Sequence, residues 1–280
     1  MRIAHVTDLH VGRVTPFEIQ REAQLLVNDQ DPDLVLITGD FVCHSQLYLD
    51  QLTQLMEGFR APVIAVLGNH DYWAGAEEVC QALRRAGVEV LRNQLTTITV
   101  RGQALQIVGL DDAYTGHARR EKAVAGLRPE LPSLALSHIA EEADFLWPYG
   151  IPLVLSGHTH GGQITLAGLH EITLGKIGGH KYLHGLYGTR QANDNGGAVY
   201  VGAGIGAAVM PLRIGDRGKR EVTVFELGVS PGIFDEHHAE QPALPGRKVT
   251  ARKLERRIAK VARKRERRAN RQTQEMPVVR

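Results

Sequence analysis

Aspartate, asparagine and histidine residues recur in five short clusters along the first 160 residues of the chain. In chain order the clusters are Asp8-Leu9-His10, Gly39-Asp40, Gly68-Asn69-His70-Asp71, Ser137-His138 and Gly157-His158-Thr159-His160. Carboxylate, amide and imidazole donors without a thiolate suit Mn²⁺, Fe or Zn²⁺. Two divalent cations a few ångströms apart need one shared ligand, and a carboxylate such as Asp40 can bridge them where an imidazole cannot easily do so. The clusters therefore predict a site for two divalent metal ions.

Each cluster comes at the end of a short apolar run that is typical of a buried strand. These runs lie at residues 2–7, 34–38, 63–67, 133–137 and 152–155. Helical periodicity between the first three runs, at residues 17–29 and 46–58, gives a βαβαβ order and indicates a largely parallel sheet covered by helices. Ligands bind at the carboxyl ends of the strands in such sheets. We therefore expect the five clusters to meet at one edge.

The remaining sequence continues the α/β pattern and then changes character. Residues 96–108 predict a hairpin with its turn at Arg101-Gly102. Further helices are expected at 118–126 and 141–147, and late strands at 163–166, 198–202 and 222–227. A segment rich in Pro, Gly and His follows. We expect three parts: a catalytic domain over residues 1–228, a linker over 229–246 and a basic tail over 247–280.

Bulk composition excludes several classes of protein. The chain has 280 residues, 43% apolar and 23% charged, which is ordinary for a globular enzyme. Cys43 and Cys80 are its two cysteines and form no CxxC pair, so we expect neither a disulfide framework nor a thiolate zinc site. We expect no spanning helix, which would need about 20 apolar residues. We expect no cleavable signal either, because residues 2–7 lead directly to Asp8, and therefore predict a cytoplasmic protein.

The order of the five clusters resembles that of the calcineurin-like metallophosphoesterase family. Three longer motifs are similar to its bacterial YkuE/YaeI-type branch, which includes UDP-diacylglucosamine pyrophosphatases of lipid A biosynthesis: GHTHGGQ at 157–163, HKYLHGLY at 180–187 and VGAGIGAAVMPLRIG at 201–215. The resemblance covers about residues 1–227. It implies a four-layer α/β/β/α sandwich, here followed by a basic helical tail.

The resemblance also implies roles for individual residues. One metal would be held by Asp8, His10, Asp40 and His160, and the second by Asp40, Asn69, His138 and His158. His70 would protonate the leaving oxygen or bind the phosphate, with Asp71 orienting it. A metal-bound hydroxide would attack phosphorus in line. Manganese is the first choice of metal, with iron and zinc as alternatives.

The chain departs from the branch at two points. Ile139 stands where members of the branch often have proline after the histidine that corresponds to His138. We expect this change to matter little for metal binding. We also find no N-terminal membrane anchor or export signal of the kind that many members carry. This second departure bears on location and on how the chain reaches a lipid substrate.

For most of the other polar residues, we expect a structural role. His5 lies within the first strand and should pack in the core. Histidines in loops could contact substrate, but a structural role is favoured for each of His44, His117, His180 and His184. Arg13 could reach a phosphate oxygen or lie on the surface, and the two alternatives are equally favoured. Cys43 is expected to be a small buried apolar side chain.

Residues 247–280 contain 14 Lys and Arg against 3 Asp and Glu, a net charge of +11. Ala251, Leu254, Ile258 and Val261 recur at helical spacing among these basic residues. One interpretation is an amphipathic helix on an anionic membrane. A nucleic-acid contact is the second interpretation, and a solvated extension is the third.

The predicted reaction is hydrolysis of a phosphodiester or pyrophosphate bond by a phosphodiesterase-like metal-dependent hydrolase. A lipid-linked substrate such as UDP-diacylglucosamine is favoured, because the branch and the basic tail both point to lipid. The protein would then be cytoplasmic and peripheral on the inner face of the membrane. One alternative is a soluble nucleotide or nucleic-acid phosphodiesterase. A second is a non-catalytic binding scaffold, which has no need for a full set of ligands.

Overall fold

The computed structural model describes residues 1–163, 165, 171–188, 196–207, 212–215, 218–229 and 240–275, with side chains to residue 270. Two sheets form the centre of the molecule. The first has the order β11 (Thr223–Glu226), β1 (Arg2–Val6), β2 (Leu34–Thr38), β3 (Val63–Val66) and β4 (Glu89–Val90). The second has the order β5 (Gln94–Val100), β6 (Gln103–Gly109), β7 (Ser133–Leu136), β8 (Leu153–Ser156), β10 (Ala198–Val201) and β9 (Gly185–Gly188).

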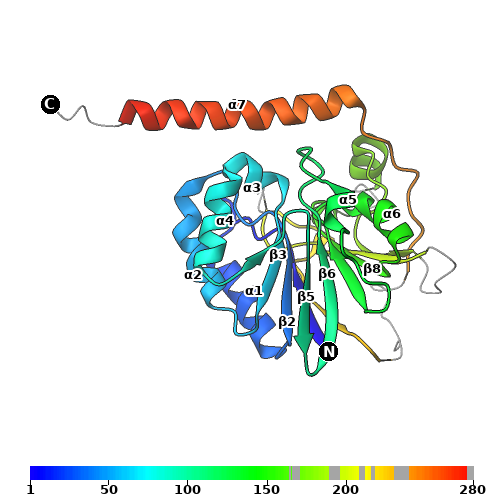
Figure 1. Cartoon of the computed structure of the whole chain (residues 1–280). Coiled ribbons are helices and arrows are strands. Elements are labelled where there is room, and N and C mark those ends of the chain that lie inside the picture. The colour runs from blue at the N-terminus through cyan, green and yellow to red at the C-terminus, as the bar shows by residue number, and fades with distance from the viewer. Residues whose placement is uncertain are drawn as a thin grey trace.

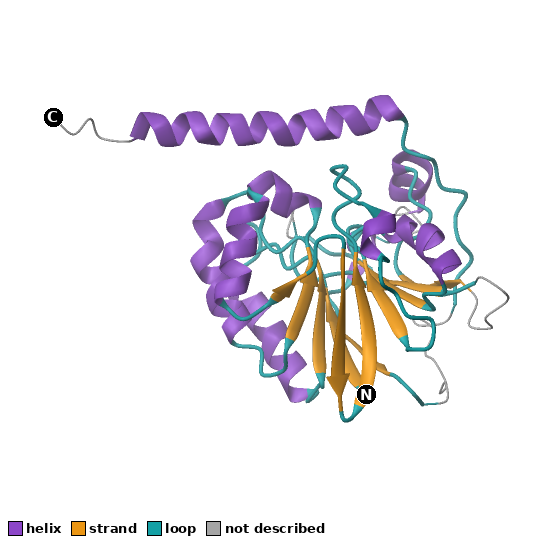
Figure 2. Ribbon diagram, in the orientation of Figure 1, coloured by secondary structure: helices purple, strands orange, loops and turns teal. Residues whose placement is uncertain are grey.

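Helices cover the outer face of each sheet (Figures 1 and 2). Beside the first sheet lie α1 (Phe17–Asp29), α2 (Leu49–Glu57), α3 (Asn69–Ala74) and α4 (Ala76–Arg85). Beside the second lie the short helices α5 (Arg120–Ala123) and α6 (Ala143–Leu146). Shorter helical segments occur at Gln46–Tyr48, Ala140–Glu142, Trp147–Tyr149, His160–Gly162 and Glu171–Gly178. The tail forms one long helix, α7 (Ala251–Glu275).

Three apolar clusters separate four layers. Alternate residues of a strand point to opposite faces of the sheet. In β1, for example, Ala4 packs toward the helices of the first sheet and Ile3 packs toward the second sheet. A further cluster, which includes Val108 and Leu146, fills the space between the second sheet and its helices. The predicted four-layer α/β/β/α sandwich is thus confirmed.

The parallel pairings β1–β2, β2–β3, β6–β7, β7–β8 and β8–β10 bring the carboxyl ends of these strands to the side on which α7 lies. The hairpin turn at Arg101-Gly102 is confirmed by the pairing of Val100 with Gln103. The helix predicted over 118–126 is shorter, because after Val124 the backbone N–H of Ala125 bonds to Lys122, three residues back, and no longer to the residue four back. The strand expected at 163–166 falls partly outside the described residues, and Gln163 and Thr165 lie in no strand.

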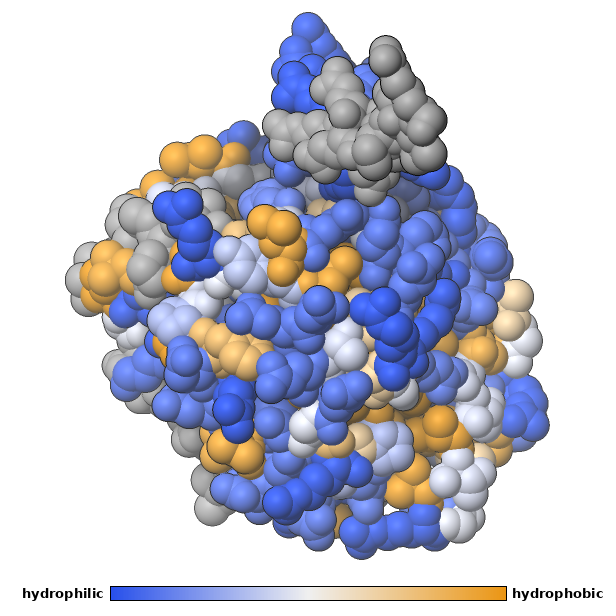
Figure 3. Space-filling view, turned by 90° about the vertical axis from the view of Figure 1, so that its left-hand side faces the viewer, coloured by the Kyte–Doolittle hydropathy of each residue, from blue (hydrophilic) through white to orange (hydrophobic). Residues whose placement is uncertain are grey.

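The surface is largely hydrophilic, because the amphipathic helices turn their polar sides to solvent. Hydrophilic residues cover most of the face shown in Figure 3, and apolar residues form small separate patches. Leu25 and Leu26 of α1 are about half exposed. Among the described helices, none combines the length and apolar character needed to cross a membrane.

Candidate metal centre

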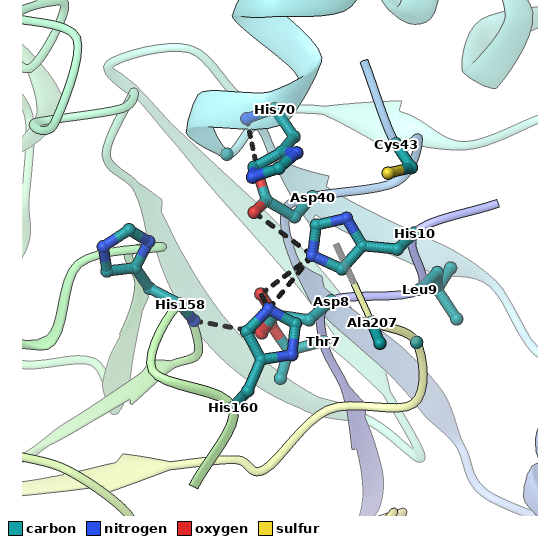
Figure 4. Close-up of polar contacts among 12 residues, drawn as sticks. Thr7, Asp8, Leu9, His10, Asp40, Cys43, His70, His158, His160 and Ala207 are labelled. Atoms are coloured by element: carbon teal, nitrogen blue, oxygen red, sulfur yellow. Dashed lines mark hydrogen bonds and ion pairs between the residues drawn. The ribbon is translucent and has the colours of Figure 1, made fainter. Parts of the chain in front are cut away.

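The loops after the strands hold five of the predicted ligands in a left-handed backbone conformation. Their φ angles are 51° for Asp8, 44° for His10, 56° for Asp40, 76° for His158 and 55° for His160. Side chains other than glycine seldom adopt this conformation, and such strain clusters at functional sites. It turns the five side chains toward a common space between the two sheets (Figure 4).

Glycines allow these loops to approach one another. A Cβ added to Gly68 would collide with the Asp40 carboxylate, and one added to Gly157 would collide with Thr7 and Asp8. Gly68 and Gly157 therefore allow close packing of the loops around the site. At Gly68 glycine is required because there is no space for a side chain. A left-handed backbone conformation is not the reason, because the φ of Gly68 is −109°.

Asp8 has one oxygen fixed and one oxygen turned to the site. Its Oδ2 accepts hydrogen bonds from Thr7 Oγ1 at 2.8 Å and from the backbone N–H of His158 at 3.0 Å. Its Oδ1 has no hydrogen-bond partner among the described residues. This oxygen lies 3.3 Å from His160 Nε2 and 3.8 Å from His10 Nε2. These three side chains form a group that could hold a metal ion.

Asp40 lies between this group and a second one. Its Oδ1 accepts a hydrogen bond of 2.8 Å from the backbone N–H of His70. Its Oδ2 lies 3.5 Å from His10 Nε2 and 3.3 Å from His138 Nε2. Asp40, His138 and His158 form the second group that could hold a metal. Asp40 Oδ2 is thus the atom within reach of both groups.

Two further contacts complete the second group. His138 Nδ1 donates to the backbone oxygen of Thr38 at 2.7 Å, which turns Nε2 of the same ring toward Asp40. Such a hydrogen bond to the second ring nitrogen is usual for a histidine that binds a metal. Asn69 is buried, and its Oδ1 has no hydrogen-bond partner in the described part of the chain. Both observations fit side chains that can act as metal ligands.

Charge in the site suits a metal ion. Burial lowers the pKa of His10, His158 and His160, so these imidazoles are neutral at pH 7 and their lone pairs are free. Burial alone would raise the pKa of Asp40, but the adjacent histidines, His138 first, hold it well below its ordinary value.

Burial opposes a positive charge on His138, yet Asp40, Asp8 and Asp112 raise its pKa to about 10. The carboxylates therefore favour a positive charge where a divalent cation would replace the proton. This balance matches the donor set, which consists of oxygen and imidazole nitrogen atoms.

His70 borders the site, and the carboxylate of the next residue, Asp71, bonds to backbone groups around Asp40. The Asp71 carboxylate accepts four backbone N–H hydrogen bonds of 2.8–3.2 Å, from Asp40, Phe41, Val42 and Gly68. The His70 Nδ1 atom has no hydrogen-bond partner among the described residues. Asp71 thus shapes the backbone around Asp40, because its oxygens are already engaged there.

The other histidines divide into two groups. His5 and His184 are buried and hydrogen-bonded to Thr38 and Glu221, as a structural role requires. His44 lies closer to the site than expected, with its ring centroid 4.0 Å from that of His70. His117 stacks on Tyr72, and the His180 ring centroid is 5.4 Å from that of His158.

Sequence reasoning missed several neighbours of the site. Arg213 Nη2 lies 3.3 Å from His160 Nδ1. Arg213 belongs to the motif at 201–215, which could have indicated that this arginine lies near the site. Cys43 is half-buried and forms a third potential metal-binding group with His10 and His70. Burial and Asp40 raise the pKa of the Cys43 thiol, which makes it a poor ligand at pH 7. Arg13 is exposed.

Fold and site together define a class of protein: a four-layer α/β/β/α sandwich with a candidate dinuclear metal centre between its two sheets. The family model for calcineurin-like phosphoesterases matches residues 1–162, and this confirms the resemblance inferred from the motifs. The chain therefore belongs to the calcineurin-like phosphoesterase family and is a hydrolase of phosphate esters. Enzymes of this family use a dinuclear metal centre.

Curated relatives support the assignment. The metallophosphoesterase YkuE of Bacillus subtilis is 32% identical over 232 residues, which cover 81% of this chain and 78% of that protein. Phosphodiesterase YaeI of Escherichia coli is 31% identical over 236 residues, covering 81% of this chain and 82% of that protein. The UDP-2,3-diacylglucosamine pyrophosphatase LpxG of Chlamydia trachomatis is 26% identical over 217 residues, covering 59% of this chain and 65% of that protein.

Proposed function

We propose that the chain hydrolyses phosphodiester or pyrophosphate bonds at a dinuclear metal centre bridged by Asp40. The supporting observation is the position of Asp40 Oδ2, within 3.5 Å of both His10 Nε2 and His138 Nε2. Asp8, His10, Asp40 and His160 would hold one ion. Asp40, Asn69, His138 and His158 would hold the other. When bound, the two cations supply an activated water as nucleophile and neutralise charge on the phosphate.

The chain's own residues position the reacting groups. Thr7 and the backbone N–H of His158 fix one oxygen of Asp8, so its second oxygen keeps its direction. Burial lowers the pKa of His70 to about 4, so this side chain is a neutral imidazole at pH 7. A neutral imidazole still donates an N–H hydrogen bond. His70 therefore binds a phosphate oxygen in preference to acting as an acid.

The substrate that we propose is lipid-linked, as in the pyrophosphatase relative LpxG. Exposed Arg252, Arg256 and Arg263 give α7 a cationic outer side, and α7 lies at the end of the molecule where the metal-binding loops gather (Figure 1). Each such residue near an anionic bilayer contributes about 1 kcal/mol to binding. Membrane contact rests on charge, because Leu254 and Val261 are turned toward the body. The protein would then bind the inner face of the membrane.

Metal loading followed by assays with a small set of substrates tests the proposal. Metal-free protein is loaded separately with Mn²⁺, Fe²⁺ and Zn²⁺, and bound metal is counted per chain. Hydrolysis is then measured for bis(4-nitrophenyl) phosphate, 4-nitrophenyl phosphate and UDP-diacylglucosamine in anionic vesicles. We expect up to two ions per chain and faster hydrolysis of the diester and the pyrophosphate than of the monoester. Hydrolysis no faster than with metal alone would refute the proposal.

A soluble polyanion is the second candidate substrate. The cations of α7 that face the body are compatible with nucleotides or nucleic acid as well as with a lipid headgroup. A tail-dependent shift of RNA or DNA in a gel, without binding to anionic vesicles, would favour this candidate.

A further inference from the structure

One side of α7 is packed against the catalytic body. The half-buried residues of this helix are spaced by three and four positions, which places them on one side: Leu254, Arg257, Val261, Lys264 and Arg268. A Cβ at Gly116 would touch the side chains of Ile258 and Leu254, and Val261 packs against the core of the first sheet. Arg268 Nη2 donates to the backbone oxygen of Trp73 at 2.8 Å. The helix is therefore part of the folded body.

Cations on this side of α7 face aromatic and imidazole rings at the edge of the metal centre. We call these rings the aromatic rim: His44, His70, Trp73 and Tyr114. Arg257 Cζ lies 3.6 Å from the centre of the Tyr114 ring. Lys260 Nζ and Lys264 Nζ lie 3.9 and 5.2 Å from a ring of Trp73. Contacts of this kind are attractive, because the face of an aromatic ring carries partial negative charge.

The aromatic rim connects these cations to the predicted metal ligands. The Trp73 ring lies 4.6 Å from that of His70, centre to centre, and the His70 ring lies 4.6 Å from that of His10. The Tyr114 ring lies 5.2 Å from that of His158. The cations of α7 are thus linked to the proposed metal ligands through a continuous series of ring contacts.

No acidic residue in the described part of the chain neutralises these cations. Among the described residues, Arg257, Lys260 and Lys264 form no ion pair with a carboxylate. Burial lowers the pKa of Lys264, and the nearby charges of Lys260 and Arg268 lower it further. Gathering like charges at this place is unfavourable unless an anion lies between them.

We propose that α7 is one wall of the substrate cleft, and that Lys260 and Lys264 bind a second anionic group next to the phosphate held at the metal centre. The substrate class is therefore a polyanion with at least two adjacent phosphate groups, such as a nucleoside diphosphate derivative. A simple diester with a single negative charge leaves the second position empty. This inference rests on the proposed function and specifies its substrate.

Two ligands that differ by one phosphate test the inference. Calorimetry measures binding of uridine diphosphate and uridine monophosphate to the full-length, metal-loaded protein. The test variant is Lys260→Gln with Lys264→Gln, which keeps helix propensity and removes two charges. The control is Lys253→Gln with Arg267→Gln, which removes two charges from exposed positions of the same helix. Helix content by circular dichroism shows that both variants are folded.

We expect the wild type and the control to bind the diphosphate more tightly than the monophosphate. The test variant should weaken diphosphate binding by about 10–100-fold, because each charge-assisted contact is worth about tenfold or more. Its preference for the diphosphate should disappear. If the test and control variants weaken diphosphate binding equally, the effect comes from net charge alone, and the inference is overturned.

A second measurement distinguishes a wall from a blocking lid. If α7 merely obstructs the cleft, the test variant should hydrolyse bis(4-nitrophenyl) phosphate faster than the wild type, and the inference fails. If no phosphoester is hydrolysed by any metal-loaded form, the proposed function fails. Diphosphate binding that depends on Lys260 and Lys264 would in that case still support the anion site.

Discussion

The backbone N–H of His70 donates a 2.8 Å hydrogen bond to Oδ1 of Asp40. This bond leaves Asp40 Oδ2 directed to the two groups of histidines. The residue proposed to bind phosphate and the residue proposed to bridge the metals are thus joined through the main chain. Substitutions of the His70 side chain should leave this bond intact, whereas replacement of Asp40 by a residue without a side-chain acceptor oxygen removes it.

Asp40→Asn should lose most bound metal. Asparagine tolerates the left-handed φ of 56° at this position, where alanine would add strain, so the substitution tests the charge and the bridge. We expect metal content to fall below one ion per chain and metal affinity to fall by at least about 100-fold. Elemental analysis after dialysis measures this. The exposed Asp50→Asn is the control, and full metal content in Asp40→Asn would contradict the dinuclear assignment.

His70→Asn should keep its metal and lose turnover. The loss of one preorganised donor to phosphate typically costs about 10²-fold or more in kcat. Because the pKa of His70 is lowered to about 4, we expect the same loss for substrates with good and with poor leaving groups. Aryl phosphodiesters of graded leaving-group pKa measure this. A loss confined to poor leaving groups would instead assign proton donation to His70.

Asp71→Asn should destabilise the fold. The substitution replaces one acceptor oxygen by an NH₂ group, and two of the four backbone N–H groups at Asp71 then lose their acceptor. Each unsatisfied donor costs about 1–3 kcal/mol, so we expect the free energy of unfolding to fall by about 2–6 kcal/mol. Urea denaturation measures it. Unchanged stability with a lower kcat would favour the original expectation that Asp71 orients His70.

His5 should make the fold sensitive to acid. Burial lowers the pKa of His5 to about 4, against 6.5 as its ordinary value. The unfolded chain takes up a proton below pH 6.5, whereas the folded chain does so only near pH 4, so stability falls as pH falls through this window. The loss attributable to His5 is about 2 kcal/mol at pH 5.

His5→Gln can keep the hydrogen bond to Thr38 and removes the titration. Between pH 7 and pH 5 the free energy of unfolding should fall less for this variant than for the wild type, and we expect the difference to be about 2 kcal/mol. Urea denaturation of metal-free protein at the two pH values gives this difference. An identical pH dependence in both proteins would show that His5 is not buried in its neutral form.

Charge on the outer side of α7 should govern binding to anionic vesicles. Replacing Arg252, Arg256 and Arg263 by glutamine should weaken binding by about 3 kcal/mol at low salt. Leu254→Glu with Ile258→Glu should detach α7 from Gly116, so the vesicle binding of this variant should change in proportion to its net charge. Co-sedimentation measures both. Equal vesicle binding by the intact chain and by a chain that ends at Gly246 would exclude the membrane proposal.

Much of the site could be predicted because its signals are local. Each predicted ligand follows an apolar run within a few residues, and parallel strands bring such positions to one edge. The family match over residues 1–162 confirms the class inferred from those motifs. The apolar periodicity of the tail indicated a helix as one alternative to a solvated extension, and residues 251–275 form α7 in the structure.

Tertiary structure alone decided how these residues are held and what α7 contacts. The Asp8 carboxylate is fixed by a backbone N–H 150 residues away, and Arg268 contacts Trp73 across 195 residues. The sequence by itself therefore determined which groups stand at the sheet edge, because strand order and periodicity are local properties. Contacts between distant segments leave no local pattern, since they depend on the packing of the whole chain. For this reason the amides around Asp71 and the lysines over Trp73 became visible only in the fold.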